Sequence, residues 1–382
     1  MTDMSSKSKR QRIAIVYDWI DKWGGVERVL LELHELFPDA IFFTSAYDAT
    51  AASWAQHLPI QTTFLQHIPS WLRSKRALMI LLYPIAFETF DFSGFDLVIS
   101  VTSSFAKSIV TKPETKHICY LLTPPRYIWS HTDEYIGKHI RIFLHSIIRR
   151  MQKEDVYMSK RPDAYISISQ TVANRCKDCY GVTSPVVYPP FDAQYWATQK
   201  IREKKPVVDL PKKEFYLWVG RMESYKRVEL IIEAANKLPE KQFVLVGVGS
   251  QKAHLQKMAG KNCFFTGSVS DAELAYVYSR SHALLMPQQE DFGYVSLEAQ
   301  FFGCPVIAYG RGGAVETVIH EKTGLLFYQQ TSDDLVATLE RYRQISYNLR
   351  RSVSHLQKMN EERFGKARFQ KDFLYQLQQK MT

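Results

Sequence analysis

Short apolar runs rich in β-branched residues alternate along the chain with segments whose apolar residues recur every three or four positions. The run from Ile13 to Tyr17 predicts a buried strand, and the segment from Val26 to Phe37 predicts a helix with one apolar face. This alternation of strands and helices continues through most of the chain. Such an order is typical of parallel sheets covered by helices, so the predicted fold class is α/β.

The alternation falls into two halves, each with enough strands for a sheet of its own. In the first half, strands are predicted at residues 13–17, 41–45, 97–101, 117–122, 165–169 and 186–188. In the second half, they are predicted at residues 215–219, 243–247, 263–266, 283–286, 306–309 and 325–327. Helices are predicted between these later strands, at residues 228–238, 254–259, 272–279 and 295–302. Two Rossmann-like, doubly wound parallel sheets account for the pattern most economically.

The length of 382 residues also favours two domains, because a single domain usually has roughly 100 to 200 residues. Residues 188–192 and 200–211 have the proline and lysine content of a linker. We therefore predict a first domain of residues 1–190 and a second domain of residues 191–364. The remaining segment, residues 365–382, is predicted as a helix that can pack back on the first domain.

Composition and charge narrow the class of protein. Apolar residues make up 46% of the chain and charged residues 23%, which excludes disordered, collagen-like and disulfide-stabilised proteins. The formal charge of +10 favours an anionic partner, either a nucleotide, a nucleic acid or a phospholipid surface.

Targeting signals and cysteines indicate a cytoplasmic protein. Residues 1–12 lack the apolar core of a secretion signal, and the longest apolar run, residues 77–87, is too short to span a membrane. Only Cys176 and Cys179 form a CxxC pair. With no second pair to complete a zinc site, we interpret the cysteines as reduced structural thiols.

Several residues of the second half suit the binding of a nucleotide diphosphate. Strand 215–219 is followed by Gly220 and Arg221, and Lys226 comes at the start of the next helix. Ligands of open α/β sheets bind at the carboxyl ends of the strands, so two cations there can neutralise a diphosphate. Taken alone, an Arg and a Lys in a loop are more often plain solvated charges.

Two carboxylates, Glu290 and Glu298, lie seven residues apart around the start of a predicted helix. A Glu inside an apolar run is costly unless it accepts hydrogen bonds, and vicinal sugar hydroxyls are suitable donors. Gly293 opens the helix, so the amides of Phe292 to Val295 can face a phosphate or a sugar. The alternative is an exposed loop acid at Glu290 and a solvent-facing helix residue at Glu298.

Together these residues resemble the family 4 retaining glycosyltransferases, which have the GT-B fold of two Rossmann-like domains facing a central cleft. The family pattern is met in order by Gly-Arg and Lys at 220–226, Glu-x7-Glu and Cys-Pro-Val-Ile-Ala at 290–308, and Gly-Gly-x-x-Glu at 312–316. In the first half, Asp18 with residues 24–28 resembles the family's glycine loop. Residues 123–129 are similar to its bacterial mannosyltransferase branch, which uses GDP-mannose in polysaccharide and O-antigen synthesis.

The resemblance implies metal-independent transfer of a hexose, mannose being favoured, from a nucleotide-diphosphate sugar, with Arg221, Lys226 and Glu290 as catalytic residues. The two cations neutralise the leaving diphosphate, Glu298 binds the ribose, and Glu290 holds the donor sugar. The implied donor-binding residues are Gly24, Gly25, Gly220, Arg221, Lys226, Gly267, Glu290, Phe292, Gly293, Tyr294, Val295 and Glu298. Asp18 and Arg126 are placed on the acceptor side. The sequence contains no Asp-x-Asp, so neither a metal nor a cofactor is expected.

One departure from the family concerns a His that related enzymes often carry in the segment aligned with residues 120–124. This chain has Leu121 and Leu122 there. Either that His is dispensable in this branch or the activity is altered, and the first interpretation is favoured because the donor-binding residues are complete.

Two basic amphipathic segments suggest docking on an anionic membrane leaflet. Residues 138–161 contain seven Lys or Arg against two acids, and residues 71–87 combine Arg73, Lys75 and Arg76 with an apolar stretch. The alternative is a core helix with a solvated basic face. The predicted acceptor is a lipid-linked glycan or an oligosaccharide.

Two other functions stay open from the sequence: a sugar-nucleotide 2-epimerase of the same fold, and a nucleic-acid-binding protein. Basic charge spread over both halves, with no recognised binding module, disfavours the second.

Overall fold

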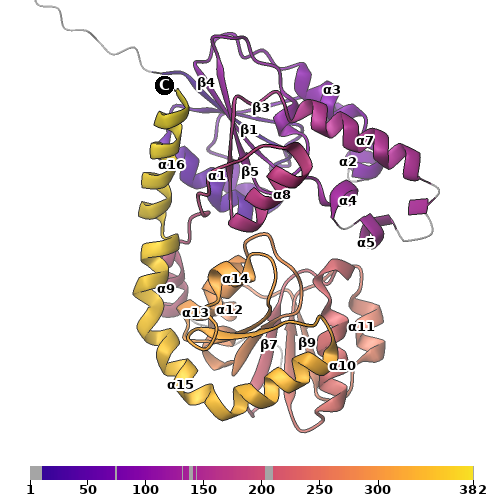
Figure 1. Cartoon of the computed structure of the whole chain (residues 1–382), viewed down its shortest axis with the longest axis vertical. Coiled ribbons are helices and arrows are strands. Elements are labelled where there is room, and N and C mark those ends of the chain that lie inside the picture. Colours follow the sequence, from indigo (N-terminus) through magenta and orange to yellow (C-terminus); the bar gives the residue numbers. More distant parts are fainter. Residues whose placement is uncertain are drawn as a thin grey trace, which may run out of the picture. The chain divides into compact units, whose positions relative to one another are not determined.

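The computed structural model describes residues 11–73, 75–130, 132–136, 141–142, 144–202 and 210–381 (Figure 1). Contacts within the chain divide it into two units. Unit 1 comprises residues 1–168, 172–187 and 370–382, and unit 2 comprises residues 169–171 and 188–369. Each unit contains one sheet, so the two are described separately.

Six parallel strands form the sheet of unit 1, in the order β3-β2-β1-β4-β5-β6. The strands are β1 (Ile13–Tyr17), β2 (Ile41–Thr44), β3 (Ile60–Thr62), β4 (Leu97–Thr102), β5 (Lys116–Leu121) and β6 (Ala164–Ser167). All six residues of β4 are buried, as expected for a central parallel strand covered on both faces. The strand order reverses between β1 and β4, the point at which open α/β sheets bind ligands.

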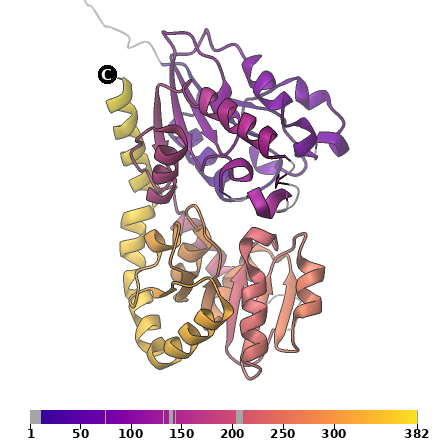
Figure 2. The ribbon, with the colours of Figure 1, turned by 45° about the vertical axis from the view of Figure 1, so that its right-hand side comes forward.

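Helices cover this sheet (Figures 1 and 2). They are α1 (Gly25–Leu36), α2 (Ser70–Arg73), α3 (Leu82–Glu88), α4 (Arg126–Trp129), α5 (Thr132–Ile136), α7 (His145–Met158) and α8 (Gln170–Tyr180). Single 3-10 turns are η1 (Ser53–Ala55), η2 (Phe64–His67), η3 (Arg76–Met79) and η4 (Ala106–Ser108). The core under α3 is aromatic: the ring of Phe43 lies 5.0 Å from the rings of both Phe90 and Phe92.

Unit 2 repeats this plan with the strand order β12-β11-β10-β7-β8-β9. Its strands are β7 (Phe215–Val219), β8 (Gln242–Val246), β9 (Cys263–Gly267), β10 (Ala283–Met286), β11 (Val306–Tyr309) and β12 (Gly324–Phe327). Its helices are α9 (Ala193–Ile201), α10 (Val228–Lys237), α11 (Lys252–Met258), α12 (Asp271–Arg280), α13 (Tyr294–Phe301), α14 (Ala314–Thr317) and α15 (Ser332–Phe364), with the 3-10 turn η5 (Ser224–Lys226). The core joins Trp218 of β7 to Ile231 of α10 and Tyr342 of α15.

The last helix, α16 (Lys366–Met381), begins after Gly365 interrupts α15. From Gln370 onward it belongs to unit 1. There the Gln370 amide donates to Glu32 of α1 at 2.6 Å, and the Phe373 ring lies 5.6 Å from the Tyr120 ring of β5. The terminal helix therefore packs on the first sheet, although residues 188–369, which lead into it, belong to unit 2.

The strands predicted from the sequence are present to within two residues at each end, with one exception. Residues 186–188 contribute only an isolated bridge between Val186 and Ser167. Pro185 and Pro189 lack the N–H that a longer ladder requires. Strand β3 was not predicted, because its three residues are too few to show a period. The predicted fold class, two parallel Rossmann-like sheets, is confirmed.

Candidate active site

The loop after β7 begins with Gly220 at the carboxyl edge of the unit 2 sheet. A Cβ on the neighbouring Gly247 would lie 1.8 Å from the Gly220 carbonyl oxygen, so only glycine allows the two loops to approach this closely. Arg221 follows with an exposed side chain and donates to the Tyr225 hydroxyl at 3.2 Å. Gly267 ends β9 at the same edge, with a φ of 75°.

Lys226 ends η5, immediately before α10, and its side chain turns toward the loop after β10. Its Nζ lies 2.5 Å from Glu290 Oε1. The same oxygen accepts a hydrogen bond from Gln288 Nε2 at 2.8 Å. The two charged side chains retain only 16% and 13% exposure, so they form a nearly buried ion pair with two donors on one carboxylate oxygen.

Helix α13 begins beside this pair. Gly293 precedes it with a φ of 93°, a left-handed conformation that favours glycine. The turn of the chain is fixed by Phe292, which is buried against the rings of Tyr188, Tyr294 and Phe364. The helix has no internal acceptor for the amides of its first residues, Tyr294 and Val295, and its N-terminus carries partial positive charge.

Glu298 lies one turn into α13 and is 5% exposed. The hydroxyl of Tyr278, a buried residue of α12, donates to Glu298 Oε2 at 2.9 Å. The alternative, a solvent-facing helix residue at Glu298, is therefore wrong. The neutral Tyr278 hydroxyl holds this carboxylate inside the domain. A carboxylate can accept several hydrogen bonds, including bonds from the hydroxyl groups of a ligand.

The second glycine-rich turn packs directly on the Glu290 loop. The Gly313 amide donates to the Glu290 carbonyl at 2.8 Å. A Cβ on Gly312 would lie 2.4 Å from the Glu290 carbonyl oxygen, and one on Gly313 would lie 2.5 Å from Phe292. These glycines therefore fix the backbone of the loop that carries Glu290.

Glu316, the acid of the Gly-Gly-x-x-Glu segment, accepts hydrogen bonds from residues 170 and 171. Its carboxylate accepts hydrogen bonds from the amides of Gln170 and Thr171 at 2.8 and 3.0 Å and from the Thr171 hydroxyl at 3.0 Å. Ser169 is held in a similar way, because its hydroxyl donates to the Asp291 carbonyl at 2.6 Å. Glu316 thus caps the first turn of α8 and ties residues 169–171 to unit 2.

The remaining predicted residues belong to unit 1. Gly24 and Gly25 lie at the start of α1, where a Cβ on Gly24 would lie 3.0 Å from a carboxylate oxygen of Glu27. Glu27 is buried, and desolvation raises the pKa of its carboxyl. The glycine loop therefore has an acid directly beneath it.

Asp18 differs from its expected place on the acceptor side. It is fully buried, and its carboxylate accepts four hydrogen bonds of 2.8 Å, from the Thr102 hydroxyl and from the amides of Ser103, Phe105 and Ala106. The side chain organises the loop after β4 and presents no oxygen to solvent. We therefore correct its assignment from ligand contact to loop support.

Arg126 begins α4 with a half-buried side chain. Leu121 and Leu122, at the position of the family's usual His, are buried at the end of β5, and the Leu122 amide donates to the Thr102 carbonyl at 2.9 Å. The segment is therefore an apolar part of the core.

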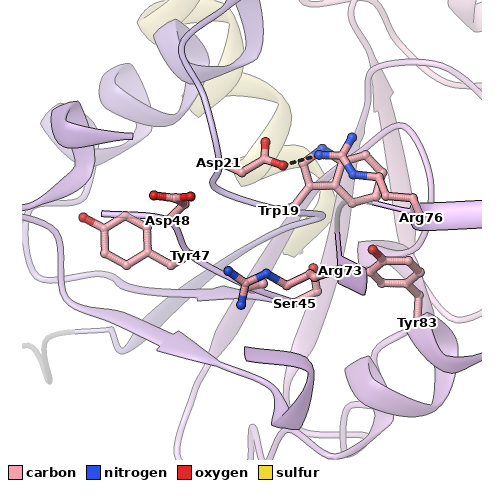
Figure 3. A pocket seen from close by; sticks show the side chains of 9 residues that line it. Trp19, Asp21, Ser45, Tyr47, Asp48, Arg73, Arg76 and Tyr83 are labelled. Atoms are coloured by element: carbon pink, nitrogen blue, oxygen red, sulfur yellow. Dashed lines mark hydrogen bonds and ion pairs between the residues drawn. The ribbon is translucent and has the colours of Figure 1, made fainter. Parts of the chain in front are cut away.

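Sequence patterns did not reveal a hollow at the carboxyl ends of β1 and β2 (Figure 3). Its polar side chains include Asp21, Tyr47, Asp48, Arg73 and Arg76. These residues come from the loops after β1 and β2 and from α2 and η3, and they share no period, so no spacing identifies them together.

Metal ligands and reactive thiols are not part of the site in the described parts of the chain. Over those residues, no three His, Cys, Asp or Glu side chains gather as they would around a metal ion. Cys176 and Cys179 are unbridged, and burial raises the pKa of Cys176 to about 11 and that of Cys179 to about 12.

The chain is similar to known proteins over part of its length. Residues 199–355 match the family described as glycosyl transferases group 1. Sulfoquinovosyl transferase SQD2 of Arabidopsis thaliana is 36% identical over 135 residues, which are 34% of this chain and 26% of SQD2. Human alpha-1,3/1,6-mannosyltransferase ALG2 is 26% identical over 213 residues, 47% of this chain and 51% of ALG2. The chain thus spans about a quarter to a half of these relatives.

A solved structure extends the likeness in fold to nearly the whole chain. HepE of Anabaena, in complex with UDP, matches with a TM-score of 0.69 at 18% identity, over 96% of this chain and all of HepE. The expected GT-B fold is therefore confirmed. The residues that match the glycosyl transferases group 1 family, 199–355, include Gly220, Arg221, Lys226, Glu290 and Glu298.

Proposed function

We propose that this protein is a retaining glycosyltransferase that moves a hexose from a nucleotide-diphosphate sugar to a glycan acceptor without a metal ion. The observation that carries the proposal is the nearly buried pair of Lys226 and Glu290, with Arg221 in the same loop as Lys226 and the N-terminus of α13 beside Glu290. This arrangement combines positive charge for a diphosphate with a carboxylate for sugar hydroxyls at one sheet edge.

The chemistry required of these residues is stabilisation of the leaving group. As the bond between the anomeric carbon and the diphosphate oxygen breaks, negative charge grows on the diphosphate. Lys226, Arg221 and the first amides of α13 offset that charge. The acceptor hydroxyl bonds to the anomeric carbon on the same face, and its proton passes to the departing phosphate oxygen. No protein base is needed in this scheme.

Mannose carried by GDP is the proposed donor. ALG2, which aligns with about half of this chain, is a mannosyltransferase by name, and this supports mannose. HepE was solved with UDP-glucose, which makes that donor the natural competitor. Glu298 is proposed to accept hydrogen bonds from the ribose, a contact that serves either nucleotide.

The proposed acceptor is a lipid-linked glycan or oligosaccharide of cell-surface polysaccharide synthesis, met at the cytoplasmic face of an anionic membrane. Apolar side chains on α2, η3 and α3 support this surface, because Trp71, Leu78 and Leu81 are 65%, 70% and 67% exposed. On the second basic segment, Ile142 and Ile147 are also exposed, whereas residues 138–140 and 143 lie outside the described residues. Across the described helices, none is both long and apolar enough to span a bilayer.

A donor screen tests the proposal. Thermal unfolding is measured with GDP-mannose, UDP-glucose, GDP and UDP, and a ligand at 100 times its Kd should add about 2.7 kcal/mol to the free energy of unfolding. The stabilising sugar nucleotide is then supplied with a radiolabelled sugar. Transfer of label to an acceptor or to water supports the proposal, whereas release of an epimerised sugar or an intact donor overturns it.

A further inference from the structure

The three residues 169–171 belong to unit 2, although the residues on both sides of them belong to unit 1. Ser169, the first of the three, is fully buried, and its hydroxyl donates to the Asp291 carbonyl at 2.6 Å. Asp291 directly follows Glu290, the carboxylate of the proposed donor site. A side chain that enters from a distant part of the sequence therefore holds the backbone beside this carboxylate.

Glu316 closes a ring of hydrogen bonds around the Glu290 backbone. Its carboxylate accepts from the amides of Gln170 and Thr171 at 2.8 and 3.0 Å. Three residues before Glu316, the Gly313 amide donates to the Glu290 carbonyl at 2.8 Å. The ring runs through three segments, residues 169–171, 290–291 and 313–316. A displacement of either Ser169 or Glu316 would therefore shift the backbone that carries the Glu290 carboxylate.

Helix α14, which carries Glu316, is itself held by its neighbours. Gln300 Nε2 of α13 donates to the Thr317 carbonyl at 3.0 Å, and Arg363 Nη2 of α15 donates to the Glu316 carbonyl at 2.8 Å. The Ser296 hydroxyl donates to the Thr317 hydroxyl at 2.7 Å, and both side chains are buried. Satisfied buried networks of this kind are rigid. The ring of hydrogen bonds is therefore fixed to a firm frame.

The loop that carries Glu290 depends on such support. Residues 287–293 lie outside any helix or strand, so their carbonyl groups need donors from other segments. Glu290 must also be placed accurately, because its carboxylate lies 2.5 Å from Lys226 Nζ. Misplacement of a reacting group by about 1 Å can reduce a rate by about 10²-fold. The rate of the proposed transfer should therefore depend on the groups that hold this loop.

We propose that Ser169 and Glu316 are positioning residues for the transfer, which place the Glu290 carboxylate through the backbone of residues 290–291. Neither side chain touches the donor in this assignment. The inference rests on the proposed function, because it gives Glu290 its role on the donor sugar.

Hydrogen exchange of the full-length protein tests the support of the loop without any donor. Ser169→Ala removes the donor to the Asp291 carbonyl, and Glu316→Gln replaces one acceptor oxygen with an NH₂ group. Exchange is followed by mass spectrometry in peptides that cover residues 287–297 and 312–318. Each variant should raise the exchange rate in both peptides by about tenfold. Unchanged exchange in both variants overturns the inference.

Kinetics then separate a positioning role from a merely structural one. At a temperature where each variant is folded, Ser169→Ala and Glu316→Gln should each lower kcat about tenfold and leave the donor KM within about twofold. When Ser169→Ala is added to Glu290→Gln, kcat should fall by less than about twofold further, because the carboxylate that Ser169 positions is no longer present. Equal losses with and without the Glu290 carboxylate, or unchanged kcat in both single variants, overturn the inference.

Two matched controls make the same chemical changes elsewhere. Asp334 also accepts hydrogen bonds from two amides, those of Tyr328 and Gln329, at 2.8 and 2.7 Å. The hydroxyl of Ser159, a buried residue of unit 1, donates to the Val156 carbonyl at 2.8 Å. Asp334→Asn and Ser159→Ala should therefore keep the exchange of both peptides and kcat at wild-type values. Losses as large as those of the ring variants would overturn the inference.

The two proposals fail in different ways. A wild-type protein that turns over no sugar nucleotide overturns the proposed function, and the assigned role in transfer falls with it. A wild-type protein that is active and loses kcat in Glu290→Gln, but not in Ser169→Ala or Glu316→Gln, overturns the positioning role alone.

Discussion

Lys226 Nζ and Glu290 Oε1 lie 2.5 Å apart, although the two residues are 64 positions apart in the chain and come from loops after β7 and β10. The pair has little exposure, so each charge is costly without the other. A diphosphate that draws Lys226 away leaves Glu290 to accept hydrogen bonds from the donor sugar, with Gln288 Nε2 still in place at 2.8 Å. We therefore propose that donor binding is an exchange of partners within this pair.

Removal of either cation should slow the transfer step. Lys226→Ala and Arg221→Ala are each expected to reduce kcat by roughly 10²-fold or more, the scale for losing a preorganised charge stabiliser. The measurement is steady-state transfer at saturating donor. Lys237→Ala is the matched control, because Lys237 pairs with Asp333 on the surface of α10 and should keep a normal rate. Near-normal turnover in both site variants would remove the diphosphate assignment.

The two carboxylates should separate in their kinetic effects. Glu298→Gln is expected to raise KM for the donor with little change in kcat, because ribose contacts act on the ground and transition states alike. Glu290→Gln should lower kcat, because a contact to the sugar can strengthen as the sugar parts from its diphosphate. Donor titrations of both variants decide between them, and the reverse pattern would show that the two roles are exchanged.

Tyr278→Phe provides a graded test of the Glu298 role. The Tyr278 hydroxyl donates to Glu298 Oε2 at 2.9 Å, and this hydrogen bond is buried. Its loss should raise the donor KM less than Glu298→Gln does, since the carboxylate itself remains. An equal or larger effect on kcat would indicate that Tyr278 acts on the reacting atoms.

The sheet and the unit 2 site could be predicted because their signals are local in sequence. A buried parallel strand is a continuous apolar run, and Gly220, Arg221 and Gly293 each follow or open such an element directly. Once the strands are known, these residues can be placed together at the carboxyl edge of the sheet, because each follows the end of a parallel strand or opens a helix there. Gly312 lies so close to the Glu290 carbonyl that a side chain at this position would clash with it. This reason for a glycine involves two loops, so the sequence of either loop alone does not show it.

Other assignments depend on contacts between distant segments, which spacing does not encode. Asp18 has the position of a ligand-binding residue after β1, yet its oxygens are occupied by amides about 85 residues later in the chain. In the same way, Asp21 and Tyr47 meet at one hollow only because β1 and β2 are neighbours. The role of such a residue is recognised from its hydrogen-bond partners or from the lack of one. Identifying those partners requires a three-dimensional structure.

Chelation should leave the transfer reaction largely intact. Arg221 and Lys226 supply the charge that a divalent ion would otherwise bring to the diphosphate, so excess EDTA is expected to change the initial rate little. The assay is donor turnover before and after treatment, with buffer exchange to remove loosely held ions. An activity that falls and is restored by Mg²⁺ or Mn²⁺ would contradict the metal-independent scheme.

His117 should make the stability of unit 1 depend on pH. Its side chain is fully buried on β5, with Nε2 2.8 Å from the Ser100 hydroxyl, and burial, aided by the charge of Arg161, lowers its pKa to about 3. Above pH 6.5 the imidazole is neutral in both folded and unfolded chains, so it adds no pH dependence. Between pH 6.5 and about 3, only the unfolded chain binds the proton.

The free energy of unfolding should therefore fall as the pH drops through that range, by up to about 1.4 kcal/mol per pH unit from this group. His117→Gln removes the titrating group, so its stability should decline less steeply than that of the wild type between about pH 6.5 and about pH 4.5. Urea unfolding of both proteins across this range measures the two slopes. His67→Gln, at an exposed residue of η2, serves as the matched control and should follow the wild type. Parallel slopes for His117→Gln and wild type would mean that His117 takes up its proton in the folded chain, and that the Ser100 contact survives its charge.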